Sequence, residues 1–412
     1  MAGRGERLQP LTNTRPKALI PVGNRMILDY VIEAAAPHVD GFVFVVNYRE
    51  EDIRAYVAEH YPGLYVSYAR QERVCGTANA VLAADGIDEP FVCLNGDIYV
   101  DPACVADAVD LHRRTGQQVL CTKEMENRGE YGSVVARDGR LCEIREKETA
   151  SLAHVNIGVY VFTPAIFDAI RATPLSPRGE YELTDSIIAL RDTFAVHAHE
   201  GYWNDIGYPW SLLEVNEHLV SCQDACIEGT VEERATVQGK VWIGEGTLVR
   251  NGAYIVGPVR IGRNCDIGPN CFIRPYTTIG DHCHVGNATE IKNSILFSHT
   301  NAAHLSYVGD SVIGEGCNLG AGTLIANLRH RKDPVKMEIK GVVVSSHRRK
   351  LGVVIGDHTK TGINVSIYEG RKIGDHCGIG PGVILDSNVE PHTLVLAKQE
   401  HAVLRTGKEE DR

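Results

Sequence analysis

Two patterns of apolar residues divide the chain. In the first half, short continuous apolar runs alternate with amphipathic stretches such as 51–60 and 103–113. The runs are 42–46, 91–94 and 119–121. Continuous apolar runs are typical of buried strands, and the amphipathic stretches of helices. The alternation predicts an α/β sandwich with a mostly parallel sheet, in which ligands bind beyond the carboxyl ends of the strands.

The second half has a six-residue period. An aliphatic or aromatic residue recurs at every sixth position from Val237 to Phe297, and the spacing resumes within 313–325 and 355–385. Glycine often follows the aliphatic residue and permits a corner. Such hexads predict a left-handed parallel β-helix, in which each hexad forms one face of a coil and the aliphatic side chain points inward.

Composition changes at the same place. Of the 41 glycines among 412 residues, 16 lie in residues 1–225 and 25 in residues 226–412. The first part has 20 Lys and Arg against 33 Asp and Glu, and the second has 22 against 20. We therefore expect a first domain over 1–222, the β-helix over 223–400 and a disordered tail over 401–412.

Several classes of protein are disfavoured. The net charge of −11 argues against broad nucleic-acid binding, and no apolar run approaches a membrane span. No secretory signal is visible and the 12 cysteines form no CxxC pair, so we expect a cytoplasmic protein without nucleic-acid or membrane partners. Five cysteines share one position of the hexad and are expected to point into the coil: Cys265, Cys271, Cys283, Cys317 and Cys377. Three histidines share another and are expected at solvated corners: His282, His358 and His376.

The opening segment carries the sharpest local signal. It reads Gly3-Arg4-Gly5-Glu6-Arg7-Leu8, then Pro10-Leu11-Thr12, then Arg15-Pro16-Lys17. It is neither a dinucleotide GxGxxG motif nor a P-loop. A glycine-rich turn lets backbone N–H groups approach phosphates, and Arg7 and Lys17 would supply the cations that phosphate chemistry needs.

This segment resembles the signature of the sugar-1-phosphate nucleotidylyltransferases. Further matches follow in order: Gln71 to Gly76-Thr77-Ala78, Leu94-Asn95-Gly96-Asp97, Glu130-Tyr131-Gly132, Glu146-Lys147, Asn156-Ile157-Gly158 and Trp203-Asn204-Asp205-Ile206-Gly207. The resemblance covers residues 2–215 and implies a Rossmann-like (GT-A-like) domain. Such a domain joins a hexose or hexosamine 1-phosphate to UTP or dTTP and releases pyrophosphate.

The resemblance also assigns roles to residues. Arg7 and Lys17 neutralise the triphosphate, and Asp97 and Asp205 hold Mg²⁺, a hard cation that prefers oxygen ligands. The nucleotide is bound by Gly3, Gly5, Gln71, Gly76 and Thr77. The sugar phosphate is bound by Tyr131, Gly132, Glu146, Lys147 and Asn156.

One departure from that family concerns the beginning of the chain. The family has an apolar strand directly before the glycine-rich turn, whereas this sequence starts Met1-Ala2-Gly3. Omitting a central strand would leave backbone groups of both neighbouring strands unpaired. We therefore expect the translation start of the natural protein to lie one strand earlier.

The β-helix carries a second resemblance. The matching strings are Ile291-Lys292-Asn293-Ser294, His304-Leu305-Ser306-Tyr307-Val308-Gly309-Asp310, Asn318-Leu319-Gly320-Ala321-Gly322-Thr323 and Ala326-Asn327. They are similar to the acetyltransferase half of the GlmU-like bifunctional enzymes that make UDP-N-acetylglucosamine. The similarity implies a homotrimer, or a multiple of trimers, that binds acetyl-CoA between neighbouring coils. His304 would be the general base, because its pKa lies near neutrality.

Further residues of this second site follow from the same resemblance: Arg274 and Lys292 for the sugar phosphate, Tyr307, Asn318 and Asn327 for the amino sugar, and Ala321 for the acetyl-CoA cleft. The family has a lysine where this chain has Asp333, and we expect one of the flanking lysines, Lys332 or Lys336, to substitute for it, with Lys336 as the residue assigned here. The basic residues 328–352 interrupt the hexads, as in archaeal-type members, and predict a projecting loop that either contacts CoA phosphates or is solvated.

The sequence thus predicts a bifunctional enzyme that acetylates glucosamine 1-phosphate and then uridylates the product. Glucose-1-phosphate thymidylyl transfer is an alternative, because close relatives accept thymine. A non-catalytic regulatory subunit with the same domains is a second alternative. Such subunits tend to lose the cations and carboxylates that Arg7, Lys17, Asp97 and Asp205 supply here.

Overall fold

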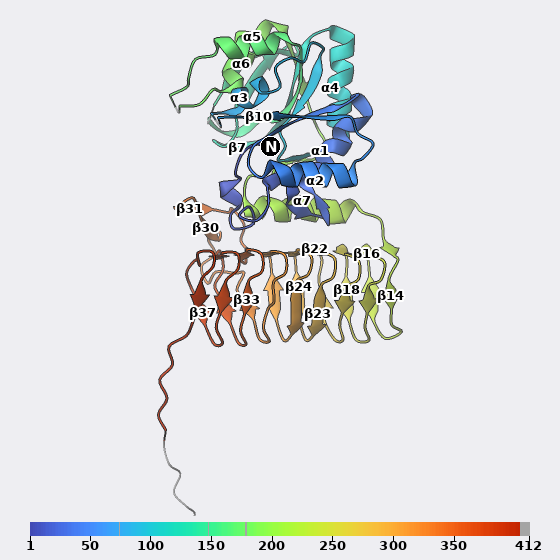
Figure 1. Ribbon diagram of the computed structural model, residues 1–412, viewed down its shortest axis with the longest axis vertical. Coiled ribbons are helices and arrows are strands. Elements are labelled where there is room, and N and C mark those ends of the chain that lie inside the picture. Colours follow the sequence, from blue (N-terminus) through green and yellow to red (C-terminus); the bar gives the residue numbers. More distant parts are fainter. Residues whose placement is uncertain (74, 147, 178, 404–412) are drawn as a thin grey trace, which may run out of the picture.

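The computed structural model describes residues 1–73, 75–146, 148–177 and 179–403, and its two domains lie one above the other (Figure 1). The helices of the first domain are α1 (Ile27–Ala35), α2 (Glu50–His60), α3 (Thr77–Leu82), α4 (Pro102–Thr115), α5 (Ala165–Ala172), α6 (Leu183–Ala189) and α7 (Pro209–Cys222), with 3-10 turns η1 (Glu6–Leu8), η2 (Lys17–Leu19), η3 (Ala36–His38) and η4 (Arg191–Thr193). Helices α2 and α4 confirm the two amphipathic stretches. Within the described part of the chain, no helix has the length and apolarity needed to cross a bilayer.

The main sheet of the first domain has six strands in the order β5 (Phe91–Leu94), β10 (Thr149–Phe162), β7 (Gln118–Arg128), β11 (Phe194–Ala198), β9 (Arg140–Arg145), β8 (Ser133–Arg137). The expected strands β5 and β7 are present, but the expectation of a mostly parallel sheet is wrong. Only β11 and β7 pair in parallel within it, because the long β10 runs antiparallel between β5 and β7.

Three small pairs of strands complete this domain: the parallel β3 (Phe42–Val46) and β4 (Val66–Arg70), and the antiparallel β1 (Pro21–Val22) with β2 (Arg25–Met26) and β6 (Ile98–Val100) with β12 (Trp203–Asp205). The β3–β4 pair and the six-stranded sheet are separate among the described residues. The Ala2 carbonyl accepts a hydrogen bond from Tyr48 N at 3.3 Å, and a Cβ on Gly96 would lie 2.2 Å from Met1 Cγ. The expected earlier start remains a prediction.

The second domain is a β-helix with three faces of parallel strands. The first face contains β13 (Cys226–Ile227), β16 (Val241–Ile243), β19 (Val259–Ile261), β22 (Thr277–Ile279), β25 (Ile295–Leu296), β28 (Val312–Ile313), β32 (Val354–Ile355) and β35 (Lys372–Ile373). The second contains β14 (Thr230–Val231), β17 (Leu248–Val249), β20 (Asp266–Ile267), β23 (His284–Asn287) and β26 (Asn301–His304), then β33 (Lys360–Thr361), β36 (Gly378–Ile379) and β38 (Leu394–Val395). The third contains β15 (Thr236–Gln238), β18 (Tyr254–Val256), β21 (Phe272–Ile273), β24 (Glu290–Lys292), β27 (Tyr307–Gly309), β29 (Leu324–Ile325), β34 (Ser366–Ile367) and β37 (Ile384–Leu385).

The hexad explains this architecture. Residues 18 positions apart pair on successive coils, as Leu248 does with Asp266, so three hexads make one coil. The repeating aliphatic residues fill the interior, together with the five cysteines expected there. The corner residues His282, His358 and His376 are exposed and have positive φ angles, as expected of solvated corners.

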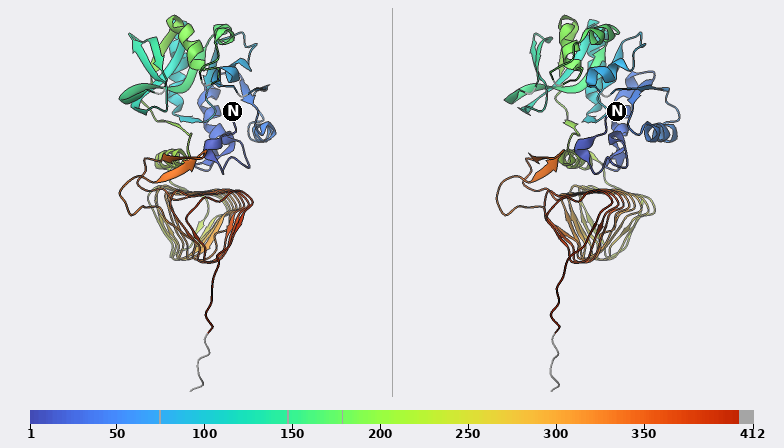
Figure 2. Two further views of the ribbon diagram at one scale, coloured as in Figure 1. Left: turned by 90° about the vertical axis from the view of Figure 1, so that its left-hand side faces the viewer. Right: turned by 60° about the vertical axis from the view of Figure 1, so that its left-hand side comes forward.

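The segment expected as a projecting loop contains a β-hairpin, β30 (Lys336–Ile339) with β31 (Val342–Ser345). Figure 2 shows that it rises from the β-helix to the side of the first domain. Lys340 Nζ lies 2.7 Å from Glu6 Oε2, and Arg348 donates to Glu217 Oε1 at 2.6 Å. The projection is therefore confirmed, but the segment contains a paired hairpin, and Lys340 and Arg348 bind carboxylates of the first domain. Its contact with CoA phosphates stays a prediction.

The two domains share a buried interface along the first face of the β-helix. Leu8 and Leu11 lie in one apolar cluster with Phe297 of the β-helix. Arg15 donates to Asp357 at 2.5 Å and to Glu315 at 2.8 Å. This interface fixes the glycine-rich turn directly above the β-helix.

Candidate active sites

The glycine-rich turn has a fixed shape. Gly5 has a φ of 63° and precedes η1, and its carbonyl accepts a hydrogen bond from Thr12 Oγ1 at 3.0 Å. A Cβ at this position would lie 2.9 Å from Thr12 Cγ2 and 3.2 Å from Lys17 Cβ. Glycine is therefore required at Gly5 for its backbone conformation and for space. Gly3 has open space around it.

Lys17, Asp97 and Asp205 meet at the carboxyl end of β5. Lys17 Nζ donates to Asp97 Oδ2 at 2.6 Å. Asp205 ends β12, which pairs with β6, and Ile206 N donates to the carbonyl of Asp97 at 3.0 Å. The structure thus brings together two carboxylates that are 108 positions apart in the sequence. The ammonium of Lys17 links the glycine-rich segment to the end of β5.

The two carboxyl groups titrate differently. Burial raises the pKa of Asp205 to about 6, and the negative charge of Asp97 adds to this effect. Burial acts in the same direction on Asp97, but the charge and hydrogen bond of Lys17 outweigh it and lower the pKa of Asp97. Two carboxylates that repel each other beside a single ammonium are a donor set that suits a divalent hard cation.

Arg7 lies against the same corner. Its guanidinium carbon is 5.1 Å from the centre of the Tyr208 ring. A Cβ on Gly207 would lie 3.0 Å from Asp205 Oδ2 and 3.5 Å from an Arg7 nitrogen, so both groups crowd this glycine. Arg7 and Lys17 therefore place two positive charges next to the carboxylate pair.

The segment expected to recognise the base folds around Gln71, which is buried. Its Nε2 donates to Asn79 Oδ1 at 3.0 Å. Gly76 precedes α3 with a φ of 101°, and a Cβ there would lie 2.4 Å from the carbonyl oxygen of Tyr181. Thr77 accepts a hydrogen bond from Leu183 N through Oγ1 at 3.2 Å. The close approach of the Tyr181 backbone explains why this position is glycine.

The residues expected to bind the sugar phosphate lie between β7 and β8, directly after β9 and within β10. Tyr131 packs edge-on against Trp203 with ring centres 5.3 Å apart, and burial together with the nearby Asp205 charge raises its pKa. A Cβ on Gly132 would lie 3.1 Å from Glu146 Oε1. Asn156 N donates to the Gly132 carbonyl at 2.9 Å, which joins these elements. Lys147 lies outside the described residues.

The second candidate site centres on Asp310, whose side chain is 2% exposed. Lys292 Nζ lies 3.0 Å from Asp310 Oδ2, and Asn327 donates to the same oxygen at 2.6 Å. Asn327 also donates to Tyr307 Oη at 3.0 Å. Asp310 thus joins three of the predicted residues, Lys292, Asn327 and Tyr307, in one network. The sequence alone assigns no role to Asp310.

Glu290 is a second carboxylate of this site to which the sequence alone assigns no role. Arg274 Nη1 donates to Glu290 Oε1 at 2.7 Å, with Glu290 on the coil that follows. Arg274 and Lys292 therefore each have an acidic partner on a neighbouring coil. The eighteen-residue spacing of the coil could have identified Lys292 with Asp310, whereas Arg274 and Glu290 are 16 positions apart and do not follow that spacing.

His304 ends β26 on an edge of the β-helix and is exposed. Its carbonyl accepts from Gly322 N, the carbonyl of Ala321 accepts from Asn364 N, and that of Ile363 accepts from Gly382 N. His304, Ala321 and Ile363 therefore occupy one position on three successive coils. Two predicted residues lie elsewhere: Asn318 at a bridge to Asn301, and Lys336 exposed on β30.

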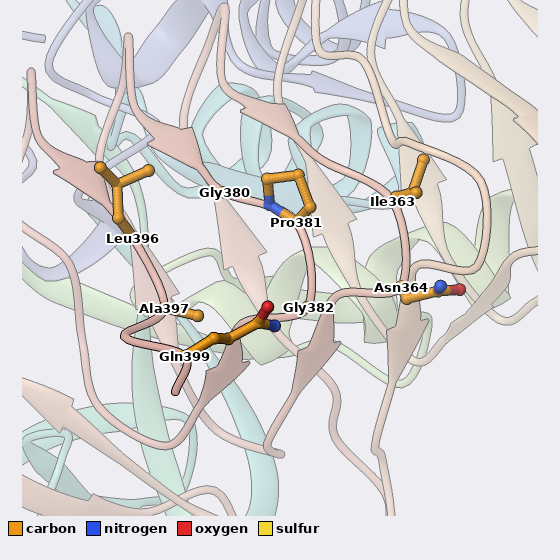
Figure 3. A pocket seen from close by; sticks show the side chains of 8 residues that line it. All are labelled: Ile363, Asn364, Gly380, Pro381, Gly382, Leu396, Ala397 and Gln399. Carbon is orange, nitrogen blue, oxygen red and sulfur yellow. The ribbon is translucent and has the colours of Figure 1, made fainter. Parts of the chain in front are cut away.

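A groove opens further along this edge (Figure 3). It has a volume of about 530 Å³ and passes from Ile363 and Asn364 over the corner at Pro381. Leu396 and Gln399 line its other side. The groove continues the row that starts at His304 and Ala321.

Comparisons with known proteins agree with this architecture. A nucleotidyl transferase family model matches residues 1–221, a GMPPB C-terminal domain model matches residues 255–349, and a bacterial transferase hexapeptide model (six repeats) matches residues 352–387. The fold and the two sites therefore define a nucleotidyltransferase domain fused to a hexapeptide-repeat transferase domain.

Curated relatives resemble the chain over nearly its whole length. It is 40% identical to the "Bifunctional protein GlmU" of Methanocaldococcus jannaschii, over 97% of each chain. It is 36% identical to the "Bifunctional sugar-1-phosphate nucleotidylyltransferase/acetyltransferase" of Sulfurisphaera tokodaii, over 94% of this chain and 96% of the relative. A "Glucose-1-phosphate thymidylyltransferase" of Streptomyces antibioticus is 34% identical over 82% of this chain and 98% of its own. The chain belongs to the GlmU family of bifunctional sugar-1-phosphate nucleotidylyltransferase/acetyltransferase enzymes.

Proposed function

We propose that this enzyme makes UDP-N-acetylglucosamine in two steps at two separate sites. The β-helix transfers the acetyl group of acetyl-CoA to the amine of glucosamine 1-phosphate. The first domain then joins N-acetylglucosamine 1-phosphate to UTP and releases pyrophosphate. The nucleotidylyltransferase and acetyltransferase activities in the name of the Sulfurisphaera tokodaii relative, together with the two groups of residues described above, support an enzyme with two sites.

In the nucleotidyl transfer, a phosphate oxygen of the sugar 1-phosphate attacks the α-phosphorus of UTP, and pyrophosphate leaves. The protein contributes positioning and neutralisation. Arg7 and Lys17 neutralise charge on the triphosphate as it moves to the leaving group. Gln71, Gly76 and Thr77 bind the nucleotide with Gly3 and Gly5. Tyr131, Gly132, Glu146, Lys147 and Asn156 bind the sugar phosphate.

Asp97 and Asp205 are the residues that would hold Mg²⁺, and the bound ion would supply positive charge against the triphosphate. The chemistry of these two carboxylates supports the binding of Mg²⁺ at this place. The two carboxylates repel each other, and among the described side chains Lys17 donates the hydrogen bond to the Asp97 carboxylate. A divalent cation would relieve that repulsion at the carboxyl end of β5.

In the acetyl transfer, the amine nitrogen attacks the thioester carbonyl of acetyl-CoA and CoA leaves as the thiol. His304 takes the proton from the amine. Arg274 and Lys292 bind the sugar phosphate, Tyr307, Asn318 and Asn327 position the amino sugar, and Lys336 assists from the hairpin. Acetyl-CoA runs from His304 over Ala321 toward the groove at Pro381, a path supported by the shared position of these residues on successive coils.

We also propose that the active form is a homotrimer or a multiple of it, with acetyl-CoA held where neighbouring chains meet. The exposed His304 and the shallow groove beyond it support this arrangement, since a second chain would cover both.

The single observation that carries the proposal is the Lys17–Asp97 contact with Asp205 opposite, because it assembles the phosphate-transfer site from three distant segments. The test is a substrate matrix that crosses UTP and dTTP with glucose, glucosamine and N-acetylglucosamine 1-phosphates, with and without acetyl-CoA. Pyrophosphate and free CoA are measured separately. We expect CoA release with glucosamine 1-phosphate and the fastest pyrophosphate release with UTP and N-acetylglucosamine 1-phosphate. A preference for dTTP and glucose 1-phosphate without CoA release would overturn it.

A further inference from the structure

A cluster of sulfur and nitrogen donors lies in the first domain, away from the residues assigned to catalysis. Cys104 belongs to α4, and His197 and His199 lie on or directly after β11. Helix α4 packs across β7 and β11 of the main sheet. The three side chains come from segments 93 and 95 positions apart, so no sequence motif links them.

The geometry of this cluster is that of metal ligands. One coordinating atom from each of Cys104, His197 and His199 lies within 4.8 Å of the other two. Cys104 is fully buried and His199 is 6% exposed. The Nε2 atoms of both histidines are buried without a hydrogen-bond partner within the described part of the chain. Buried ring nitrogens normally have a partner, and a metal ion held by both rings would supply one.

The donor types favour a bound cation. A cysteine ligates a metal as its thiolate, and a histidine does so through a neutral ring nitrogen. Cys104, His197 and His199 therefore offer one sulfur and two nitrogen donors at one place.

We propose that Cys104, His197 and His199 bind one zinc-class divalent metal ion. Sulfur and imidazole donors select Zn²⁺ or Co²⁺, whereas Mg²⁺ requires oxygen donors. Three protein ligands leave a fourth tetrahedral position. A water molecule can fill that position, and Asp107 Oδ2 lies 3.6 Å from His197 Nε2 beside the cluster.

Such an ion would act as a structural crosslink between α4 and β11. Asp97 lies seven residues before Cys104, and Asp205 lies six residues after His199. The crosslink would therefore brace the two segments that lead to the β6–β12 pair. It would take no part in the transfer chemistry.

The test uses the full-length, reduced and metal-stripped protein with Co²⁺ and Zn²⁺ as probes. We expect one equivalent of Co²⁺ per chain, with the thiolate-to-cobalt charge-transfer absorption and d–d bands of a tetrahedral ion. Zn²⁺ should displace it, and excess Mg²⁺ should not. His197→Gln and His199→Gln should each weaken Zn²⁺ binding by at least about 10-fold, and Cys104→Ser should abolish the charge-transfer absorption.

Matched controls separate this site from other side chains. Cys222 and His218 form the exposed pair on α7, with sulfur and ring nitrogens 3.9 Å apart, and Cys222→Ser should bind Co²⁺ as the unmodified protein does. If the circular dichroism spectrum shows that the Cys104→Ser variant is unfolded, the His197→Gln variant takes its place in the test. The His197 side chain is 20% exposed and therefore tolerates replacement better. The proposal is overturned if the folded protein shows no thiolate-to-cobalt absorption, or if the absorption survives Cys104→Ser or disappears with Cys222→Ser.

Discussion

The ammonium of Lys17 lies 2.6 Å from the carboxylate of Asp97, although 80 positions separate them in the chain. Lys17 begins the 3-10 turn η2 after the glycine-rich segment, and Asp97 follows strand β5. The contact therefore joins the glycine-rich segment to the strand end where the second carboxylate, Asp205, also lies. It fixes the position of the cation before any substrate is bound.

The first prediction concerns Asp97→Asn. The substitution keeps the size of the side chain but removes the charge that binds Lys17 and would hold Mg²⁺. We expect pyrophosphate release to fall by about 100-fold or more, because removing a preorganised electrostatic group has effects of this size. Acetyl transfer, measured as CoA release, should be unchanged. Loss of both activities together would contradict two independent sites.

The second prediction is the reverse case. His304→Ala removes the proposed general base of the acetyl transfer, and CoA release should fall by about 100-fold to 10,000-fold. Pyrophosphate release from UTP and N-acetylglucosamine 1-phosphate should continue at the original rate. His299→Ala is a suitable control because His299 is another histidine of the β-helix, stacked on His282 at a corner. Unchanged acetylation in His304→Ala would remove His304 from the mechanism.

The third prediction tests the base-recognition segment. Gly76→Ala would place a Cβ 2.4 Å from the Tyr181 carbonyl oxygen in a backbone conformation that favours glycine. A strained backbone of this kind costs about 1–3 kcal/mol. We expect a higher KM for UTP and a lower melting temperature. The control is Gly86→Ala. Gly86 has a φ of 111°, and its added Cβ would have no atom within 4 Å, so this variant has the backbone strain without the contact with Tyr181. Equal effects at both positions would show that the Tyr181 contact is unimportant.

The fourth prediction concerns the interface between the domains. Arg15→Ala leaves the carboxylate of Asp357, 2% exposed, without its guanidinium partner. Removing one partner of a buried ion pair costs about 3 kcal/mol, and chemical denaturation should report a loss of that order. Arg113→Ala removes a guanidinium that is 63% exposed and should change stability by less than about 0.5 kcal/mol. A similar stability for both variants would show that the pair does not hold the domains together.

The fifth prediction concerns the oligomer. Light scattering should give three times the chain mass of 45.1 kDa, or a multiple of that value. A β-helix with an exposed His304 edge is expected to complete its acetyl-CoA site against a second chain. A clean monomer that retains full CoA release would rule out an acyl site shared between chains.

Much of the fold could be predicted because it repeats. The hexad fixes both the buried aliphatic row and the corner histidines, since each coil pairs only with the coils before and after it. The strand β3 and the helices α2 and α4 were also predictable, because their apolar periods are local. The antiparallel course of β10 was not, since a buried strand has the same pattern in either direction.

The parts that could not be predicted depend on distant residues. Arg15 and Asp357 meet across 342 positions, and nothing near either residue indicates the other. Lys340 reaches Glu6 only because the hairpin folds back onto the first domain. The Lys292–Asp310 pair differs from these, because the eighteen-residue spacing of the coil could have indicated it.

The most direct test of two separate sites is a complementation assay with Asp97→Asn and His304→Ala. Each variant alone is given glucosamine 1-phosphate, acetyl-CoA and UTP, and UDP-N-acetylglucosamine is measured by chromatography. We expect the Asp97→Asn variant to accumulate N-acetylglucosamine 1-phosphate and the His304→Ala variant to form no product. Mixing the separately purified variants should restore UDP-N-acetylglucosamine, because the acetylated intermediate diffuses from one site to the other. Failure of the mixture to form product, with each variant retaining its own half-reaction, would contradict the account.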